Sequence, residues 1–434
     1  MIDPTAWQRH QEGMALKLAL IGAGQRGMIY SSSASRRAEI VAVAEPHEGR
    51  RRAAAEQFGI AAERQYASAE ELFRQGKIAD AVIVSSMDRD HYEQTMRALD
   101  LGYDILLEKP ISPSPQECVQ IQQKANEKGR KVTVCHVLRY TNFFAELKRI
   151  IDGGELGKVV TIQHNENIGN FHMAHSFVRG NWRRSDLSSP LIMQKSCHDM
   201  DILAWLANSE AKRISSYGEL VFFKEENAPE GSTDRCLTCP AAAGCRFDAR
   251  KMYLPIAGGW PATVVSEDQS EEGLLKALET GPYGQCVFRN DNDVCDHQVS
   301  IIEFKNGVKV TFHLSAFTNK MHRTIKIMCE HGEIRGDDAQ NLIEVTKFSS
   351  NMAEAVEQRV IRPASVSGGH NGGDEGLIHD FLNELERGGS DSRSSIDKSV
   401  ESHVMAYAAE KARLTGTVVD VDLFKLELRE AVLS

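Results

Sequence analysis

The stretch "LKLALIGAGQRG" (residues 16–27) decides the fold class. Its first six residues predict a short buried strand, and Gly22, Gly24 and Gly27 follow in the spacing G-x-G-x-x-G. Glycine lets the chain turn sharply and lets backbone N–H groups approach a pyrophosphate at the positive end of the next helix. A glycine-rich turn without a ligand is the alternative, and the flanking strand and helix favour dinucleotide binding.

A repeated alternation of strand and helix continues after this turn. Further aliphatic runs such as "EIVAVAE" and "DAVIVSS" are separated by polar helical stretches such as "HYEQTMRALDLG". Because strand–helix–strand units connect in a right-handed sense, this alternation predicts a doubly wound parallel sheet and an α/β fold. We expect a leader at 1–15, a Rossmann dinucleotide-binding domain at 16–140, and a substrate and oligomerisation domain at 141–434.

The second predicted strand ends in Glu45, 21 residues beyond Gly24. A carboxylate at this place accepts hydrogen bonds from the adenosine ribose hydroxyls and repels a 2′-phosphate. Glu45 therefore favours NAD over NADP, although Arg50 and Arg51 lie close enough in sequence to soften the repulsion.

Composition excludes several classes of function. The chain has 434 residues, a formal charge of −10 and no Lys/Arg-rich run, which argues against nucleic-acid binding. No apolar run approaches the ~20 residues that span a bilayer, and the polar leader lacks the apolar centre of a signal peptide. We therefore expect a cytoplasmic protein that acts on a small molecule, in which the nine cysteines are reduced thiols or metal ligands.

The run "DILLEKPISPSP" (104–115) places a charged pair and a proline at the end of an aliphatic strand. Ligands bind open α/β sheets beyond the carboxyl ends of the strands, where this segment is expected. Glu108 offers Lys109 a charge partner, and Pro110 restricts the backbone that carries the lysine. A surface lysine is the alternative. A lysine near a nicotinamide could bind a substrate hydroxyl and move its proton.

The combination of "IGAGQRG", "AVAEP", "LLEKPIS", "HVLRY" and "KSCHDMDILAWL" resembles the Gfo/Idh/MocA family of oxidoreductases. The resemblance covers nearly the whole chain and implies a Rossmann domain followed by a mostly antiparallel open sheet. It implies that Lys109, in the family's E-K-P motif, holds and helps deprotonate a sugar hydroxyl. His198 matches the acid/base histidine of the family's D-x-G-x-H-x-x-D motif, and Asp201 matches the last aspartate.

The first aspartate of that motif is replaced by Gln194. A glutamine cannot take up a proton, so the proton relay that the resemblance implies is incomplete here. Lys195 and Asp199, which flank the histidine, are the predicted substitutes, and we count Lys195 with Lys109 and His198 as a candidate catalytic residue.

The remaining candidate residues surround these motifs. The predicted cofactor contacts are Gly22, Gly24, Gln25, Arg26, Gly27, Glu45, Ser85, His91, Glu108 and Lys109. The predicted substrate contacts are His175, Arg179, Trp182, Asp199 and His370. Three of these lie in "HNENIGNFHMAHSFVRGNWRRSD", where histidines, an arginine and a tryptophan offer the hydrogen-bond donors and the aromatic wall that a sugar pocket needs. A solvated loop is the alternative for this segment.

Residues 224–296 interrupt the strand pattern and contain "CLTCPAAAGC". Cys236, Cys239 and Cys245 form C-x2-C-x5-C, and Cys286 could supply a fourth ligand. Four thiolates select zinc, and a closed set of four ligands would be structural. An iron–sulfur cluster is the less favoured reading, and cysteines that merely cluster are the remaining one.

The C-terminal part predicts antiparallel hairpins, with turns at Asn306-Gly307 and His331-Gly332. We expect the broad face of this sheet to form a homodimer or a homotetramer, as the resemblance implies. The glycine-rich "SGGHNGGDEG" then presents His370 and Asp374 before a helix, either to close over substrate or as a loop that needs glycine for its shape.

Three functions remain open at this stage. The first is an NAD-dependent dehydrogenase of a sugar, glycoside or cyclitol hydroxyl. The second is an NAD-dependent glycoside hydrolase that oxidises C3 transiently, eliminates the aglycone, adds water and reduces the ketone again, a possibility kept by the resemblance of "AGQRG" and "GGHNGGDEG" to family 109 glycosidases. The third, a redox sensor that binds NAD without catalysis, would need neither Lys109 nor His198.

Overall fold

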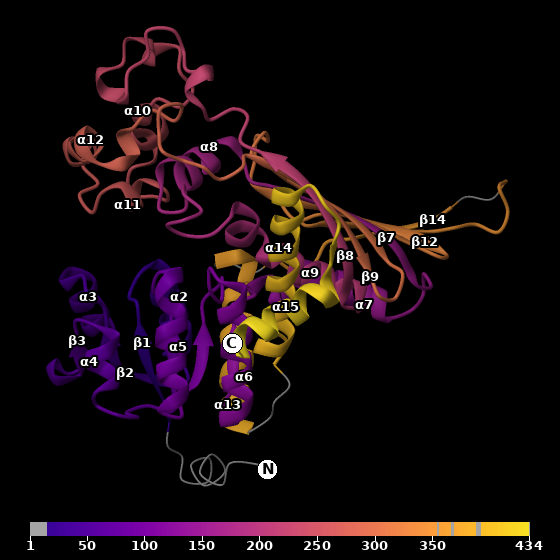
Figure 1. Ribbon diagram of the computed structural model, residues 1–434, viewed down its shortest axis with the longest axis horizontal. Helices are drawn as coiled ribbons and strands as arrows, with labels where there is room; N and C mark the ends of the chain where they lie inside the picture. The colour runs from indigo at the N-terminus through magenta and orange to yellow at the C-terminus, as the bar shows by residue number, and fades with distance from the viewer. Residues whose placement is uncertain (1–14, 354–355, 366–368, 388–391, 434) are drawn as a thin grey trace.

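The computed structural model describes residues 15–353, 356–365, 369–387 and 392–433, and it contains two β-sheets (Figure 1). The first sheet has six parallel strands in the order β3-β2-β1-β4-β5-β6. Their bounds are β1 Leu16–Ile21, β2 Ala38–Ala44, β3 Gln65–Tyr66, β4 Ala81–Val84, β5 Asp104–Leu107 and β6 Val132–Val134. The order reverses between β1 and β4, and this confirms the predicted doubly wound sheet.

Helices cover both faces of this first sheet. They are α2 Gln25–Ala34, α3 Glu48–Phe58, α4 Ala69–Phe73, α5 His91–Asp100 and α6 Pro115–Lys128. The central strands β4 and β5 are buried along their whole aliphatic length, as expected for a parallel sheet that is covered on both sides.

The second sheet has nine strands in the order β14-β13-β12-β11-β7-β10-β9-β8-β15. Their bounds are β7 Val159–Asn167, β8 Ala211–Glu219, β9 His297–Phe304, β10 Lys309–Ser315, β11 His322–Cys329, β12 Gly332–Asp337, β13 Leu342–Lys347, β14 Glu357–Ile361 and β15 Val419–Asp420. The predicted hairpins β9–β10 and β11–β12 are antiparallel, whereas β7 and β10 pair in parallel. The sheet is therefore mixed and mostly antiparallel.

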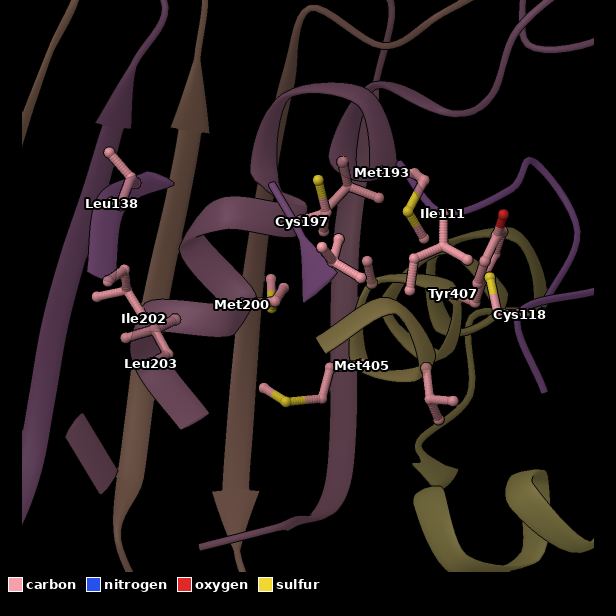
Figure 2. Close-up of a cluster of buried hydrophobic side chains, with 14 of the residues drawn as sticks. Ile111, Cys118, Leu138, Met193, Cys197, Met200, Ile202, Leu203, Met405 and Tyr407 are labelled. Carbon is pink, nitrogen blue, oxygen red and sulfur yellow. The ribbon is translucent and has the colours of Figure 1, made fainter. Parts of the chain in front are cut away.

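One face of the second sheet is covered by helices. These are α7 Asn142–Asp152, α9 Leu191–Ala207, α14 Ile396–Thr415 and α15 Val421–Leu433. Figure 2 shows Met193, Cys197 and Met200 of α9 in one buried cluster with Met405 of α14 and with Ile111. Because Ile111 belongs to the loop after β5, one continuous core joins the two sheets and holds α9 against the first of them.

Helix α13 (Gly373–Arg387) packs on the first domain, although its position in the sequence lies within the predicted second domain. Its Leu377, Phe381 and Leu382 are buried in the same hydrophobic cluster as Leu18 and Leu20 of β1. The predicted domain at 141–434 thus contributes a helix to the Rossmann domain, because the apolar face of α13 fits the side of the first sheet that its own helices leave open.

Residues between β8 and β9 form the predicted insertion. They contain α10 Ala249–Tyr253, α11 Ala262–Val265 and α12 Glu271–Thr280 around a small separate core, and Figure 1 shows them beside α8 (Asn170–His172). Short turns complete the chain: η1 Ala62–Arg64, η2 Asp88–Asp90, η3 Val137–Tyr140, η4 Met173–Arg179, η5 Glu225–Asn227, η6 Cys236–Thr238, η7 Pro240–Ala243, η8 Leu254–Ile256, η9 Pro282–Gly284 and η10 Gly369–Gly372. Of these, η4 is a π-helix. No helix in the described part of the chain is long and apolar enough to cross a membrane.

Candidate active site

The glycine-rich turn after β1 has the shape that a dinucleotide requires. Gly22 has φ +84°, and a Cβ there would lie 2.6 Å from the carbonyl oxygen of Ser85. A Cβ on Gly27 would lie 2.1 Å from the carbonyl oxygen of Gly22, so the start of α2 packs directly on the turn. A Cβ on Gly24 would meet open space, which leaves room for a ligand at the helix end.

The residues around this turn fit an NAD dinucleotide. Gly24 is the N-cap of α2 and no side chain caps this helix, so its positive end can receive a pyrophosphate. Glu45 is buried at the end of β2, and its carboxylate accepts from the backbone N–H of Ala23 (2.8 Å) and of His47 (2.9 Å). A carboxylate has about four acceptor positions, so capacity remains for ribose hydroxyls.

Other predicted cofactor residues support the turn. The hydroxyl of Ser85 donates to the carbonyl oxygens of Ile21 (3.1 Å) and Gly22 (2.8 Å). His91 is buried and its Nδ1 lies 2.8 Å from the carbonyl oxygen of Pro110, behind the E-K-P segment. Gln25 is exposed at the first position of α2.

Glu108 pairs with Arg26 rather than with the lysine beside it. Arg26 Nε donates to Glu108 Oε1 (3.0 Å), and Arg26 Nη2 donates to Asp374 Oδ1 (2.5 Å) at the start of α13. The hydroxyl of Tyr30 also donates to Glu108 (3.0 Å). Burial acts to raise the pKa of Glu108, but the charges of Arg26 and Lys109 hold it below its ordinary value. The buried carboxylate thus fastens the end of β5 to α2 and α13.

Because Glu108 is paired with Arg26, the ammonium of Lys109 is free to extend to the second domain. Lys109 Nζ donates to the backbone carbonyl oxygen of Gln194 in α9 (3.2 Å). The Lys109–Pro110 peptide bond is cis. His198, one helical turn after Gln194, lies close enough for the lysine charge to act on its ring. The structure therefore brings the two predicted acid/base residues together from different domains.

His198 is buried in an environment that keeps its ring neutral. Burial lowers the pKa of His198 well below its ordinary value, and the positive charge of Lys109 acts in the same direction. The ring centroid of His198 lies 5.6 Å from that of His136 and 6.3 Å from that of His370. Its Nδ1 has no hydrogen-bond partner among the described residues. A neutral imidazole with an open nitrogen can accept a proton.

The side chain of Gln194 binds a carboxylate that sequence reasoning missed. Gln194 Nε2 donates to Asp88 Oδ2 and to Ser188 Oγ. Asp88 lies in η2, after β4, and is buried. A carboxylate is therefore present next to the motif position, but the Rossmann domain supplies it. The clue in the sequence was an aspartate a few residues after the end of a parallel strand, where ligand sites gather.

His370 and Asp374 lie on the same side of this site. The φ angle of His370 is +49°, and its Nδ1 lies 3.2 Å from Asp374 Oδ1. Burial acts to raise the pKa of Asp374, but hydrogen bonds from His370 and Arg26 hold it well below its ordinary value. The Arg26–Asp374 ion pair fixes the start of α13 against α2, and the His370 ring lies beside that of His198.

A buried charge network lies on the other side of α9. Lys195 Nζ lies 3.1 Å from Glu166 Oε1, and Arg323 Nη2 lies 2.7 Å from Glu166 Oε2. Asp199 accepts from His164 Nε2 (2.8 Å) and from Arg323 Nε (2.8 Å). Burial acts to raise the pKa of Asp199, but Arg323 and His164 hold it below its ordinary value. Lys195 thus pairs with a residue of β7, and Asp199 pairs with residues of β7 and β11.

Glu166 differs from Asp199 in this network. Its side chain is fully buried, and burial raises its pKa although Arg323 and Lys195 oppose this effect. Two cations and two carboxylates beside one helix make a polar wall inside an otherwise apolar core.

Among the histidines between β7 and α9, the structure favours His172 over His175. The Nδ1 of His172 and the Nε1 of Trp182 are buried and have no hydrogen-bond partner among the described residues. Burial lowers the pKa of His172, and the charges of Lys195 and Lys109 lower it further, so His172 lies close to both lysines. An unpartnered polar atom near these lysines is suited to a polar ligand.

His175 and Arg179, in η4, pack against the insertion instead. The His175 ring stacks on that of Tyr283, with centroids 4.8 Å apart, and its Nδ1 lies 3.1 Å from the hydroxyl of Tyr253. Arg179 is fully buried and donates to the carbonyl oxygens of Gln285 and Phe247. We do not retain these two residues as substrate contacts.

Asp201, the last aspartate of the motif, holds the domains together. It receives two hydrogen bonds from Arg139, at 2.6 and 2.7 Å, and both side chains are buried. Because Arg139 lies in η3, directly after the last strand of the first sheet, this pair fixes α9 to the crossover between the domains.

The zinc site predicted from the cysteines is not supported. Among the described residues, no group of three His, Cys, Asp or Glu side chains is placed to hold a single metal ion. All nine cysteines are free thiols. The four candidate ligands nevertheless line one cavity in the insertion.

Comparison with known proteins agrees with the two sheets and the glycine-rich turn. A family model described as "Oxidoreductase family, NAD-binding Rossmann fold" matches residues 16–136. A second, "Oxidoreductase family, C-terminal alpha/beta domain", matches residues 148–421. Fold and site thus define a two-domain oxidoreductase with an NAD-binding Rossmann domain. The chain belongs to the Gfo/Idh/MocA oxidoreductase family.

Curated relatives include a putative oxidoreductase, YteT, of Bacillus subtilis. It is 24% identical over 324 residues, which is 72% of this chain and 74% of that protein. The inositol 2-dehydrogenase of Klebsiella pneumoniae is 27% identical over 208 residues, which is 46% of this chain and 57% of that enzyme. The match to the inositol dehydrogenase thus spans about half of each chain.

Solved structures share the fold along nearly the whole chain. An oxidoreductase domain protein from Kribbella flavida has a TM-score of 0.71 at 16% identity and covers 94% of this chain and 99% of its own. An Agrobacterium radiobacter oxidoreductase, solved with NAD+, L-tartaric acid and magnesium, has a TM-score of 0.68 at 17% identity and covers 95% of this chain and 100% of its own. At this identity the likeness concerns the fold.

Proposed function

We propose that the protein is an NAD-dependent dehydrogenase of a secondary hydroxyl in a sugar or cyclitol. The observation that carries the proposal is the meeting of Lys109 and His198 at α9, with the lysine ammonium on the carbonyl oxygen of Gln194 and a neutral histidine one turn later. The inositol dehydrogenase relatives support a polyol substrate. These relatives favour a dehydrogenase over the glycoside hydrolase.

The residues divide the chemistry between them. NAD, when bound at the glycine-rich turn, accepts hydride from the carbon that bears the reacting hydroxyl. Lys109 Nζ donates a hydrogen bond to the substrate oxygen and stabilises the negative charge that develops there. Burial keeps the ring of His198 neutral before the reaction, so its open Nδ1 can accept the hydroxyl proton. Gln194 cannot take part in this transfer and holds Asp88 in place instead.

The polar wall beside α9 suits a ligand with several hydroxyl groups. Lys195 offers a partly solvated ammonium, and His172 offers an unpartnered Nδ1 near both lysines. We propose these two residues, with Trp182, as substrate contacts, and His370 as the residue that covers the reacting end.

The cofactor preference follows from Glu45. A buried carboxylate bound to the backbone of the glycine-rich turn cannot move away from a 2′-phosphate, so we propose NAD over NADP. The enzyme would then draw on the cytoplasmic NAD pool.

The outer face of the nine-stranded sheet is the proposed interface of a homodimer or a homotetramer. Tyr217 of β8 and Ile301 of β9 are large, more than half exposed, and lie on that face. Light scattering of the purified protein tests this proposal, and a monomer at micromolar concentration would refute it.

A substrate screen tests the proposed activity. Purified protein is incubated with NAD and a panel of inositols, aldoses and nitrophenyl glycosides, and NADH absorbance and released nitrophenol are followed together. A dehydrogenase accumulates NADH in proportion to the substrate consumed. Release of nitrophenol without net NADH would show a hydrolase and overturn the proposal.

A further inference from the structure

Trp260 of the insertion presents an exposed indole beside the proposed substrate contacts. The residue is 44% exposed. Its ring nevertheless packs on His172, with centroids 5.3 Å apart, and on His175, with centroids 5.7 Å apart. His172 in turn lies close enough to Lys109 and Lys195 for their charges to act on its ring. His172 therefore links Trp260 to the proposed substrate site.

The loop that carries Trp260 is held on both sides of that residue. The backbone N–H of Gly258 donates to Gln269 Oε1 (2.9 Å), and Gln269 Nε2 donates to the carbonyl oxygen of Ala262 (3.3 Å). Ala262 itself is fully buried. A side chain on a fixed loop loses little conformational freedom when a ligand packs on it. The exposed indole is thus a preorganised surface.

Trp260 is one end of a row of rings that ends at Trp182. The ring of His172 stacks on that of Phe177, with centroids 5.6 Å apart, and Phe177 packs on Trp182, with centroids 6.0 Å apart. Two nitrogens of this row, His172 Nδ1 and Trp182 Nε1, are buried and have no hydrogen-bond partner among the described residues. Buried polar atoms are normally paired, and a sugar hydroxyl can donate to one atom and accept from another. The row therefore offers aromatic surface together with nitrogens that a sugar can bind.

Other exposed apolar side chains lie beside the same residues. Phe171 precedes His172 in the chain and is 49% exposed. Met321 is also 49% exposed, and its Sδ lies 3.7 Å from Lys195 Nζ. Large apolar side chains that gather at the surface next to polar groups are typical of a binding surface. The proposed substrate contacts are thus bordered by apolar surface on the insertion and on the segment around α8.

We propose that the substrate is a glycoside of at least two sugar rings, in which one ring is oxidised at Lys109 and His198 and a second ring stacks on Trp260. This inference rests on the proposed dehydrogenase function. The C–H groups on the face of a sugar ring carry a slight positive charge, which the negative face of an indole attracts. A free monosaccharide or inositol at Lys109 has no second ring to place on Trp260.

The insertion then selects the substrate by its length. The hydride leaves the carbon of one ring for NAD, the hydroxyl proton moves to His198, and the glycosidic bond stays intact. The second ring contributes binding energy and takes no part in the chemistry. Trp260 is thus a specificity-determining residue that the insertion adds to the site.

Kinetics with paired sugars test the proposal. Glucose, galactose and mannose are each compared with a disaccharide that carries the same sugar at its non-reducing end, namely cellobiose, lactose and mannobiose, and NADH formation by the full-length protein is followed. We expect kcat/KM for at least one disaccharide to exceed that of its monosaccharide by ~10-fold or more, mainly through a lower KM, as one aromatic contact allows. Equal kcat/KM within every pair would overturn the proposal.

Variants of the insertion locate the second ring. Trp260→Ala should lower the ratio of disaccharide to monosaccharide kcat/KM to near one, and Trp260→Phe, which keeps an aromatic ring, should retain part of it. Val264→Ala, at an exposed position of α11 in the same insertion, is the matched control and should keep the ratio of the wild type. Equal losses with both sugars in Trp260→Ala would show a structural role for the indole and refute the stacking.

Binding without turnover separates this proposal from the proposed dehydrogenase activity. With NADH in place of NAD no hydride leaves the sugar, so calorimetric titration with the three disaccharides measures binding alone. Tighter binding of a disaccharide than of its monosaccharide, lost in Trp260→Ala, would support the second-ring site even if no NADH forms in the turnover assay. NADH formation with equal efficiency from free and linked sugars would leave the dehydrogenase standing and refute the second-ring site. Absence of binding for all three disaccharides would refute it as well.

Discussion

Lys109 Nζ lies 3.2 Å from the backbone carbonyl oxygen of Gln194, one helical turn before His198. This contact crosses from the end of β5 to α9 and joins the two domains at the point where both contribute a candidate catalytic residue. Glu108, the residue before Lys109, receives its side-chain hydrogen bond from Arg26 rather than from the lysine ammonium.

Removing the lysine should abolish the hydrogen bond to the reacting oxygen. We expect Lys109→Ala to lower kcat by at least ~10²-fold, the range for a positioned acid/base group, while the dissociation constant for NAD changes little. Stopped-flow turnover and NAD titration measure the two effects. Lys128→Ala, at an exposed position in the last turn of α6, is the control. Turnover near that of the wild type would remove Lys109 from the mechanism.

Gln194 and Asp88 should behave as a pair. Gln194→Asp would bring a second carboxylate against the buried Asp88 and raise the pKa of one of them through repulsion between like charges. We expect Gln194→Asp to lose stability and activity, and the double variant Gln194→Asp/Asp88→Asn to recover both in part. Thermal melting and steady-state kinetics measure this coupling. Additive effects in the double variant would mean that the two side chains act independently.

Cofactor choice should depend on Glu45. In Glu45→Ala the repulsion of a 2′-phosphate is lost, so the ratio of kcat/KM for NAD over NADP should fall by ~10-fold or more, in line with about 1.4 kcal/mol for one lost interaction. Glu56→Ala, at an exposed position of α3, is the matched control. If the wild type already prefers NADP, our interpretation of Glu45 is wrong.

Acid should destabilise the protein through its buried histidines. Burial lowers the pKa of His175 to about 4 and that of His403 to about 3. An unfolded histidine takes up a proton near pH ~6.5, so between that pH and the native pKa the unfolded state binds more protons. As the pH decreases through this range, the free energy of unfolding should therefore decrease by up to about 1.4 kcal/mol per pH unit for each of these histidines.

Melting temperatures from pH 7 to pH 5 measure this effect. His175→Gln should show a shallower decline than the wild type, whereas His379→Gln, at an exposed position of α13, should show the same decline. An unchanged slope in His175→Gln would refute the assignment.

Local patterns were enough to predict the strands, the glycine-rich turn and the hairpins. Gly22, Gly24 and Gly27 act within one turn, and the β9–β10 pairing depends on residues that are neighbours along the chain. The partners in the site could not be predicted in the same way. Asp88 and Gln194 are 106 residues apart, and the sequence around either one does not indicate the other.

Burial also separates residues of the polar segment 164–186 that composition alone could not distinguish as substrate contacts. A histidine and an arginine in one polar segment were both candidate substrate contacts, but the core of the insertion takes up His175 and Arg179 while His172 keeps an unpartnered nitrogen. Only the three-dimensional packing of residues 224–296 against η4 separates these cases.

Helix α13 has a consequence for synthesis of the chain. Its apolar side completes the core around β1, and its Asp374 holds Arg26 beside the glycine-rich turn. Helix α13 is synthesised some 350 residues after β1. Until then, the apolar surface of the nucleotide-binding domain that α13 covers stays exposed to solvent. The first domain to emerge is thus among the last to be finished, and a fragment that ends near residue 140 should aggregate rather than bind NAD.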